Sequence, residues 1–215
     1  MNMHEQILGR PTKAKSVLMD NLKSEISAAA ARLVIQEGLD YGAAKRRAVH
    51  QLGLPARCAL PANDEIEDAV FEHIALFCAD SQSRELLALR RLALRWMERV
   101  AAFFPCLGGA VWHGSATRLS DIYIQLFCDD SKSTEILLID QGVAYEARNV
   151  TGMRGEVVSA LSVHAFCADL NEDIGVHLLI NDYDDLRGAL RLDAKGRRPR
   201  GNLAAVRQLV HDQPT

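Results

Sequence analysis

The chain has 215 residues, of which 48% are hydrophobic and 25% are charged, so it has the composition of a folded domain and not of a disordered segment. Its formal net charge of -3 excludes a strongly basic protein that overall charge would draw to nucleic acid or to an anionic membrane. No run of about 18 apolar residues occurs, so the sequence predicts no membrane span.

The first part of the chain has the periodicity of helices. Residues 1–20 are polar and mixed, and we expect a loose arm there. Apolar residues then recur at three- and four-residue steps from Ser24 to Gly38, which predicts a first helix. A second helix is expected over residues 41–52, before a glycine and a proline that end it.

Two more helices are expected before the pattern changes. The third runs from Asn63 or Asp64 to about Cys78, because either of the first two residues can cap it. The fourth is long, from about Ser83 to Phe104, and its apolar positions form a wide stripe. We place the end of a helical N-terminal region at residue 82, before this long helix.

The second part of the chain mixes strands and helices. The short apolar run Ala110–Trp112 begins it, and residues 121–127 follow as a segment rich in strand-forming side chains. The remaining expected elements are a helix from Asp129 or Asp130 to Asp140, strands at 143–148, 161–167 and 175–180, a short helix at 182–190, a basic loop at 195–201 and a final helix at 203–211. This order predicts an α+β protein, in which the helical region 1–82 precedes a mixed β-sheet flanked by helices over residues 83–215.

A turn of small residues followed by a carboxylate is the most informative motif. Gly114-Ser115 comes first, and Ser120-Asp121-Ile122-Tyr123-Ile124 follows after a short spacer. Phosphoryl transfer needs backbone N–H donors for a triphosphate, which a turn of small residues at a helix N-terminus supplies. It also needs magnesium ligands, which carboxylates two residues apart on one strand supply. The motif therefore indicates Gly114 and Ser115 as phosphate-binding residues and Asp121 as a metal ligand.

These residues resemble the hallmark of the polymerase-β-like nucleotidyltransferase superfamily. That family has a hydrophobic residue, Gly-Ser or Gly-Gly, a spacer, and then Asp-hydrophobic-Asp/Glu entering a strand. Gly114, Ser115 and Asp121 match the pattern, whereas Tyr123 stands where the second acid belongs and the spacer is shorter. The resemblance covers roughly residues 110–180, and it implies a nucleotidyltransferase-like sheet, a nucleotide ligand and magnesium.

The resemblance also places a third carboxylate on a later strand. Residues 175–180 form such a strand, but they carry His177 at that position, and Glu146 on the preceding strand region is the other candidate. One aspartate cannot hold two magnesium ions, a tyrosine is neutral at pH 7, and histidine prefers zinc-like metals. We therefore expect a degenerate member of the superfamily, with Asp121 and His177 as remnant metal ligands and two-metal catalysis lost or impaired.

Three functions remain open at this stage. The preferred one is a protein that binds a nucleotide, a phosphate-bearing ligand or a protein partner, with Arg118 or Arg197 pairing with phosphate. The second is a working enzyme, in which Asp121 and Glu146 share one magnesium ion and a nucleoside monophosphate is added to a hydroxyl. The third is a DNA-binding regulator that uses the N-terminal helices, which carry the basic run Lys45-Arg46-Arg47.

The same motifs also have simpler interpretations. Gly114-Ser115 can be an ordinary turn and Asp121 an acid at a strand edge, because short motifs give false positives. The chain also resembles bacterial proteins labelled UDP-N-acetylmuramate–alanine ligase, but it has no G-x-x-x-x-G-K-[ST] loop and is short for a three-domain ligase. No catalytic Ser/His/Asp set is evident in the sequence, since no G-x-S-x-G motif occurs.

The N-terminus and the cysteines indicate the cellular compartment. The N-terminus has no apolar core with a cleavage pattern, so we expect no signal peptide. Five cysteines are present without C-x-x-C spacing, and we expect them to be reduced thiols of a cytoplasmic protein. They are Cys58, Cys78, Cys106, Cys128 and Cys167.

Overall fold

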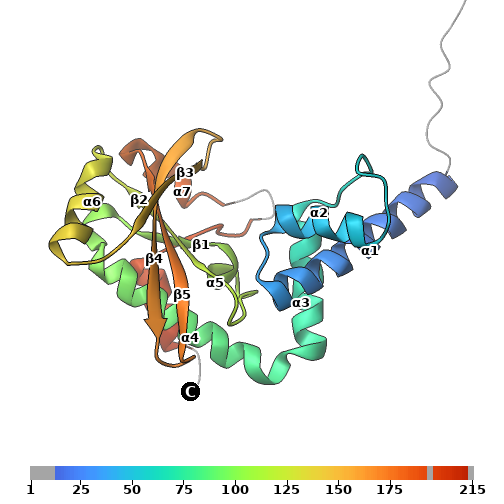
Figure 1. Cartoon of the computed structure of the whole chain (residues 1–215), viewed down its shortest axis with the longest axis horizontal. Helices are drawn as coiled ribbons and strands as arrows, with labels where there is room; N and C mark the ends of the chain where they lie inside the picture. The colour runs from blue at the N-terminus through green and yellow to red at the C-terminus, as the bar shows by residue number, and fades with distance from the viewer. Residues whose placement is uncertain (1–12, 193–195, 213–215) are drawn as a thin grey trace, which may run out of the picture. The chain divides into compact units, whose positions relative to one another are not determined.

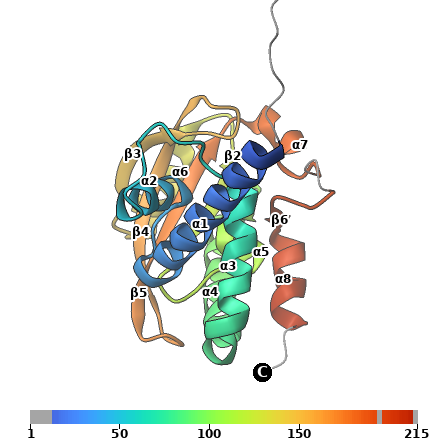
Figure 2. The same ribbon diagram turned by 90° about the vertical axis from the view of Figure 1, so that its right-hand side faces the viewer.

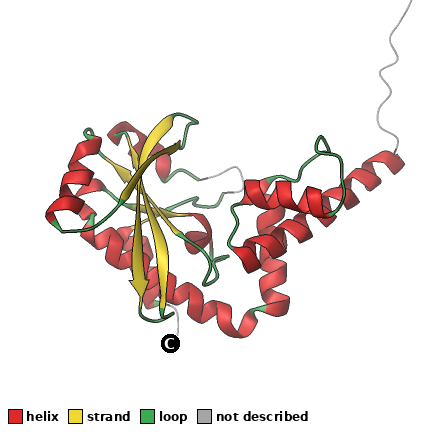
Figure 3. Ribbon diagram, viewed as in Figure 1, coloured by secondary structure: helices red, strands yellow, loops and turns green. Residues whose placement is uncertain are grey.

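The computed structural model describes residues 13–192 and 196–212, and its contacts divide the chain into two compact units, Met1–His73 and Ile74–Thr215. The division falls earlier than the boundary at residue 82 that the sequence predicts. Helices make up the described part of the first unit, whereas the second combines helices with a β-sheet (Figure 3). The expected helical N-terminal region and mixed sheet flanked by helices are therefore both present.

The first unit consists of α1 (Lys13–Glu37), α2 (Tyr41–Gln51) and most of α3 (Asn63–Phe77). α1 begins well before Ser24, because residues 13–23 are mostly good helix formers without glycine or proline. Residues 1–12 of the expected arm lie outside the described residues. Small side chains let α1 and α2 approach closely, and alanines are among the buried positions: Ala29, Ala30, Ala31, Ala44 and Ala48.

Helix α2 carries the basic run of the regulator hypothesis. Asp40 caps this helix, and its Oδ1 accepts a hydrogen bond of 2.8 Å from the backbone N–H of Ala43. Arg47 is engaged in an ion pair with Glu37 of α1, at 3.0 Å. A DNA-binding role for this run stays a prediction.

The second unit is a six-stranded sheet with helices packed against it. Its strands are β1 (Cys106–Gly108), β2 (Ile122–Phe127), β3 (Glu146–Thr151), β4 (Val157–Cys167), β5 (Glu172–Asn181) and β6 (Gly201–Asn202). Its helices are α4 (Ala79–Arg99), α5 (Gly109–His113), α6 (Ser131–Asp140), α7 (Leu186–Ala189) and α8 (Leu203–His211), with short 3-10 turns at Ala101–Phe103 and Tyr183–Asp185. Among the described helices of the whole chain, none combines the length and apolarity that crossing a bilayer requires.

The strand order is β3-β4-β5-β2-β1-β6, and the sheet is mixed. β2 and β5 pair in parallel at its centre, whereas the other neighbouring strands pair antiparallel. The long strands β4 and β5 form a hairpin that extends beyond the rest of the sheet (Figure 1). This arrangement places β2, which begins just after Asp121, beside the strand that carries His177.

The two faces of the sheet differ in chemistry, because successive side chains of a strand point to opposite sides. One face, here called the apolar face, carries fully buried side chains and packs under α4, with α6 and α8 completing the cover (Figures 1 and 2). Its central residues are Leu107, Ile122, Ile124, Leu126, Leu161, Val176 and Leu178. The other, here called the polar face, carries Tyr123, Ser162 and His177.

One short segment had no predicted element type. The apolar run Ala110–Trp112 belongs to the short helix α5, and the strand before it is Cys106–Gly108. Three apolar residues are too few for periodicity to separate a strand from a helix. Gly109, at φ 66°, makes the sharp change of direction between the two elements.

Candidate functional site

The sheet register lines up five residues across the polar face. Glu146 of β3 lies opposite Ser162 of β4, which lies opposite His177 of β5. His177 in turn pairs with Tyr123 of β2, and Tyr123 with Gly108 of β1. Side chains that are directly paired in this way lie on the same side of a sheet. The position expected for the second acid and the position expected for the third are therefore neighbours, occupied by a tyrosine and a histidine.

Asp121 lies at the start of β2 and reaches His177. Its Oδ2 accepts a hydrogen bond of 3.1 Å from Nε2 of His177. Gly175 makes room for this contact, because a Cβ there would lie 2.5 Å from Oδ1 of Asp121. The absence of a side chain at Gly175 thus lets the carboxylate lie across β5 and meet the imidazole.

The other nitrogen of His177 is also occupied. Nδ1 lies 3.0 Å from a guanidinium nitrogen of Arg148 and 2.9 Å from the hydroxyl of Ser162. A carboxylate only accepts and a guanidinium only donates, so both contacts are satisfied when Nε2 carries the proton and Nδ1 accepts. This network holds the imidazole between Asp121 and Arg148, with Nε2 as the donor and Nδ1 as the acceptor.

Tyr123 covers the histidine. The two rings are tilted with centroids 4.8 Å apart, and Tyr123 is 39% exposed while His177 is 8% exposed. A second arginine, Arg200, packs beside Gly108 of β1, on the side of Tyr123 away from His177. A Cβ at Gly108 would lie 3.4 Å from its side chain. Desolvation lowers the pKa of Arg200. The polar face therefore offers an exposed aromatic ring with a guanidinium on either side of the Tyr123–His177 pair.

The Gly114-Ser115 bend does not have the geometry expected for a phosphate cradle. It closes the C-terminal end of α5, where Gly114 has a φ of 95°. The backbone N–H groups of Gly114 and Ser115 both donate to the carbonyl of Ala110, at 2.9 and 3.0 Å. Ser115 is 2% exposed. These two N–H groups already donate within the end of α5, so they do not point at a ligand. The expectation differed because the sequence motif does not tell which end of a helix a turn occupies.

Two buried polar side chains of α4 hold this bend in place. Gln82 donates to the carbonyls of Gly114 and Ala116, at 2.9 and 2.8 Å. Arg90 donates to the carbonyls of Val111 and Trp112, at 3.1 and 3.3 Å. Together they satisfy the orphan carbonyls that a helix C-terminus leaves. Neither residue was predicted as a support from the sequence, although a glutamine and an arginine beside a helical apolar stripe were the visible signal.

Glu146 lies on the polar face but far from Asp121. Three strand spacings separate β3 from β2, which is about 14 Å between backbones. Two carboxylates so far apart do not share one ion with bonds of about 2 Å. Among the described residues, no group of three or more His, Cys, Asp or Glu side chains could hold a metal ion. The residues present therefore do not fit the magnesium site that the enzyme hypothesis requires.

The two candidate phosphate-binding arginines have different surroundings. The guanidinium of Arg118 forms an ion pair with Glu172, and its backbone N–H donates to Glu85 at 3.0 Å. Both groups therefore already contact carboxylates of the protein. Arg197 is exposed in the basic loop. That loop lies against α5, because the indole of Trp112 donates to the carbonyl of Arg198 at 2.8 Å. Lys195 lies outside the described residues.

A serine, a histidine and an aspartate do form one hydrogen-bonded line, although the sequence indicates no catalytic set of these residues. Ser162, His177 and Asp121 are connected through the two ring nitrogens of the histidine. Ser162 is 8% exposed and shares Nδ1 with Arg148, so its hydroxyl is neither accessible nor alone with its base. The line reads as a structural network and not as a hydrolase site. The sequence could not reveal it, since the three residues lie on different strands.

Comparisons with known proteins add little to this geometry. No protein-family model matches the chain, and no curated protein sequence matches it. Among solved structures, the Cid1 poly(U) polymerase, in a structure with MgGTP bound, is similar at 13% identity and a TM-score of 0.31. The match covers 56% of this chain and 39% of that chain, so the chain spans well under two thirds of the polymerase's length. At that score we draw neither fold nor function from the likeness.

Proposed function

We propose that the chain is a degenerate nucleotidyltransferase-like protein, which binds a nucleotide or another phosphate-bearing ligand on its polar face and does not transfer nucleotides by a two-metal mechanism. The hydrogen bond between Asp121 and His177, at 3.1 Å, is the observation that carries this proposal. It joins the first and third acid positions of the motif, and Tyr123 occupies the second. One carboxylate, one phenol and one imidazole thus stand where three carboxylates would hold metal.

The electrostatics of this set argue against paired magnesium ions. Two divalent cations about 4 Å apart need several carboxylate oxygens to offset their repulsion. Asp121 supplies two oxygens, of which one already accepts from His177. Arg148, next to the histidine, adds a positive charge that further disfavours a cation. The same positive charge favours an anion.

The ligand class follows from the groups that remain accessible. Arg148 is exposed, and a guanidinium binds phosphate oxygens bidentately. Tyr123 presents an exposed ring on which a nucleobase can stack. Arg200, across β1, offers a second guanidinium whose desolvation a bound phosphate would offset. An aromatic ring between two cationic groups matches a nucleotide better than a bare phosphate.

Calorimetric titration of the full chain with ATP and CTP, in EDTA and in magnesium, tests the proposal. We expect binding that is unchanged within about threefold when magnesium replaces EDTA, and no incorporation of labelled nucleotide. Arg148→Gln should weaken binding about tenfold, the loss of one charge-assisted hydrogen bond. Arg207→Gln, at an exposed position of α8 outside both faces' proposed sites, is the matched control and should leave the affinity unchanged. Binding that requires magnesium, or transfer that Asp121→Ala abolishes, would overturn the proposal.

A further inference from the structure

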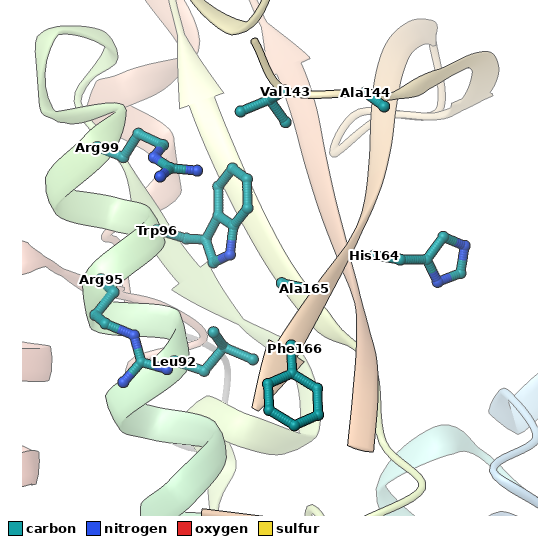
Figure 4. A pocket seen from close by; sticks show the side chains of 9 residues that line it. All are labelled: Leu92, Arg95, Trp96, Arg99, Val143, Ala144, His164, Ala165 and Phe166. Atoms are coloured by element: carbon teal, nitrogen blue, oxygen red, sulfur yellow. The ribbon is translucent and has the colours of Figure 1, made fainter. Parts of the chain in front are cut away.

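A cavity of the second unit lies beside α4. It has a volume of about 450 Å³, within the usual range for small-molecule sites, and opens between α4, the β4 end near Phe166 and the loop at Val143–Ala144 (Figure 4). Its inner wall is apolar and includes Leu92, Trp96 and Ala165. Because α4 packs on the apolar face, this cavity is separate from Asp121 and His177.

Two arginines of α4 line the cavity without an acidic partner. Arg95 and Arg99 are both exposed, stand four residues apart on one side of the helix, and take part in no ion pair within residues 13–192 and 196–212. Neighbouring charges of the helix are paired: Arg91 with Asp169 at 3.6 Å, and Glu98 with Arg207 at 2.9 Å. Like charges at this spacing destabilise a helix, and an anion between them would relieve that repulsion.

The aromatic residues of the cavity complete a binding surface. The guanidinium of Arg99 lies 4.7 Å from the ring centroid of Trp96, a cation–π contact that fixes its position. Phe166 is 59% exposed at one end of the cavity, and Trp96 projects from α4 toward the strands (Figure 4). His164 also lines the cavity, and its ring points away from Trp96 in the same view. Exposed aromatic area beside two unpaired guanidinium groups suits a flat apolar group that carries a negative charge.

We propose that this cavity binds a small aromatic anion, with its carboxylate or phosphate between Arg95 and Arg99 and its ring between Phe166 and the inner wall at Trp96. The two arginines select a ligand with an anionic group, and the apolar wall selects a ligand with a ring. The volume admits one such molecule and is too small for a folded partner. The site is independent of the proposed function, since Asp121, Tyr123, Arg148, His177 and Arg200 do not line it.

The two tryptophans of the chain give a site-specific readout. The indole N–H signals of Trp96 and Trp112 can be followed by NMR and assigned with Trp112→Phe. Titration with phenyl phosphate and with benzoate should shift the Trp96 signal and leave that of Trp112 unchanged. Binding of only one of the two probes identifies the anionic group. Failure of both at millimolar concentration overturns the proposal.

Variants and simpler probes separate the two halves of the inference. Replacing both Arg95 and Arg99 by glutamine should weaken binding at least about tenfold, whereas Arg99→Lys keeps the charge and should stay within about threefold. Arg148→Gln, on the polar face, should change nothing, so that failure here and failure of the proposed function remain distinguishable. Inorganic phosphate or neutral benzyl alcohol binding as tightly as phenyl phosphate would contradict the role of the ring or of the charge, respectively.

Discussion

The two faces of the sheet in the second unit arise from the same strands but obey different rules. Ile122 and Ile124 of β2 are fully buried under the helices, while Tyr123 between them is 39% exposed. β5 alternates in the same way, with Val176 and Leu178 on the apolar face and His177 on the polar face. The apolar face is a packed core, whereas the polar face is a network of hydrogen bonds around one imidazole. Apolar packing therefore dominates one side of this layer, and polar interactions dominate the other.

The difference teaches that a polar residue within a strand is informative only with its neighbours across the sheet. His177 alone is a buried histidine, of which proteins have many. Its contacts with Asp121, Arg148 and Ser162 come from three further strand segments. A network of this kind is costly to leave half satisfied, so its members depend on one another.

The largest effect should come from the apolar face. Leu178→Ala removes a side chain that is fully buried, and we expect a loss of about 3 kcal/mol in the free energy of unfolding. Leu179→Ala, the next residue of β5, is the matched control because it lies on the polar face and is only partly buried; it should cost about 1 kcal/mol. Urea denaturation measures both, and equal losses would contradict the distinction between the faces.

The bend that leads toward the polar face depends on α4. Gln82→Ala leaves the carbonyls of Gly114 and Ala116 without their side-chain donor, and we expect a loss of about 2 kcal/mol. Ser83→Ala, at the neighbouring exposed position of α4, should be within about 0.5 kcal/mol of the native chain. If both variants unfold at the same urea concentration, Gln82 is not a support of the bend.

Cys106, at one end of the polar face, is buried, and this burial should make the free energy of unfolding depend on pH. Cys106 packs there with Phe127 and Ala189, and burial raises the pKa of its thiol to about 11 from its ordinary value of 9.0. Between these values the unfolded chain has lost the proton and the folded chain keeps it, so stability falls as pH rises. We expect a loss of about 1–2 kcal/mol from pH 9 to 11 that is absent in Cys106→Ala. Parallel pH profiles for the two chains would contradict the prediction.

A smaller effect should follow at Gly175. A Cβ at this position collides with Oδ1 of Asp121, so Gly175→Ala should turn the carboxylate away from His177 at a cost of about 1 kcal/mol. Gly188→Ala is the control, since a Cβ there meets nothing within 4 Å. Denaturation gives the free energy, and the NMR signals of the His177 ring report the lost contact. An unshifted ring signal would mean that Asp121 finds room without leaving.

Much of this arrangement could be predicted from local patterns. The bounds of α2, β2 and α8 follow from caps, strand-forming residues and helical spacing, and the final helix at 203–211 was predicted residue for residue. The parallel neighbour of β2 could be anticipated only through the family resemblance. The strand β1 and the helix α5 were missed because each is very short.

The site was harder to predict than the fold. Asp121 and His177 were named from the sequence, and the register places them together. Arg148 and Ser162 were not named, and Arg200 was included only as part of the basic loop at 195–201, since their place beside His177 and Tyr123 depends on strand order, which no local pattern encodes. Gly114 and Ser115 were assigned to phosphate because the motif suggested a helix N-terminus, whereas the bend ends α5.

Paramagnetic broadening by Mn²⁺ tests the central claim most directly. In NMR spectra of the native chain we expect no selective loss of signals around Asp121 when Mn²⁺ is added. In the double variant Tyr123→Asp with His177→Asp, three carboxylates occupy the polar face, and selective broadening of β2 and β5 signals should appear. Selective broadening around Asp121 in the native chain would show a working metal site and would contradict the account.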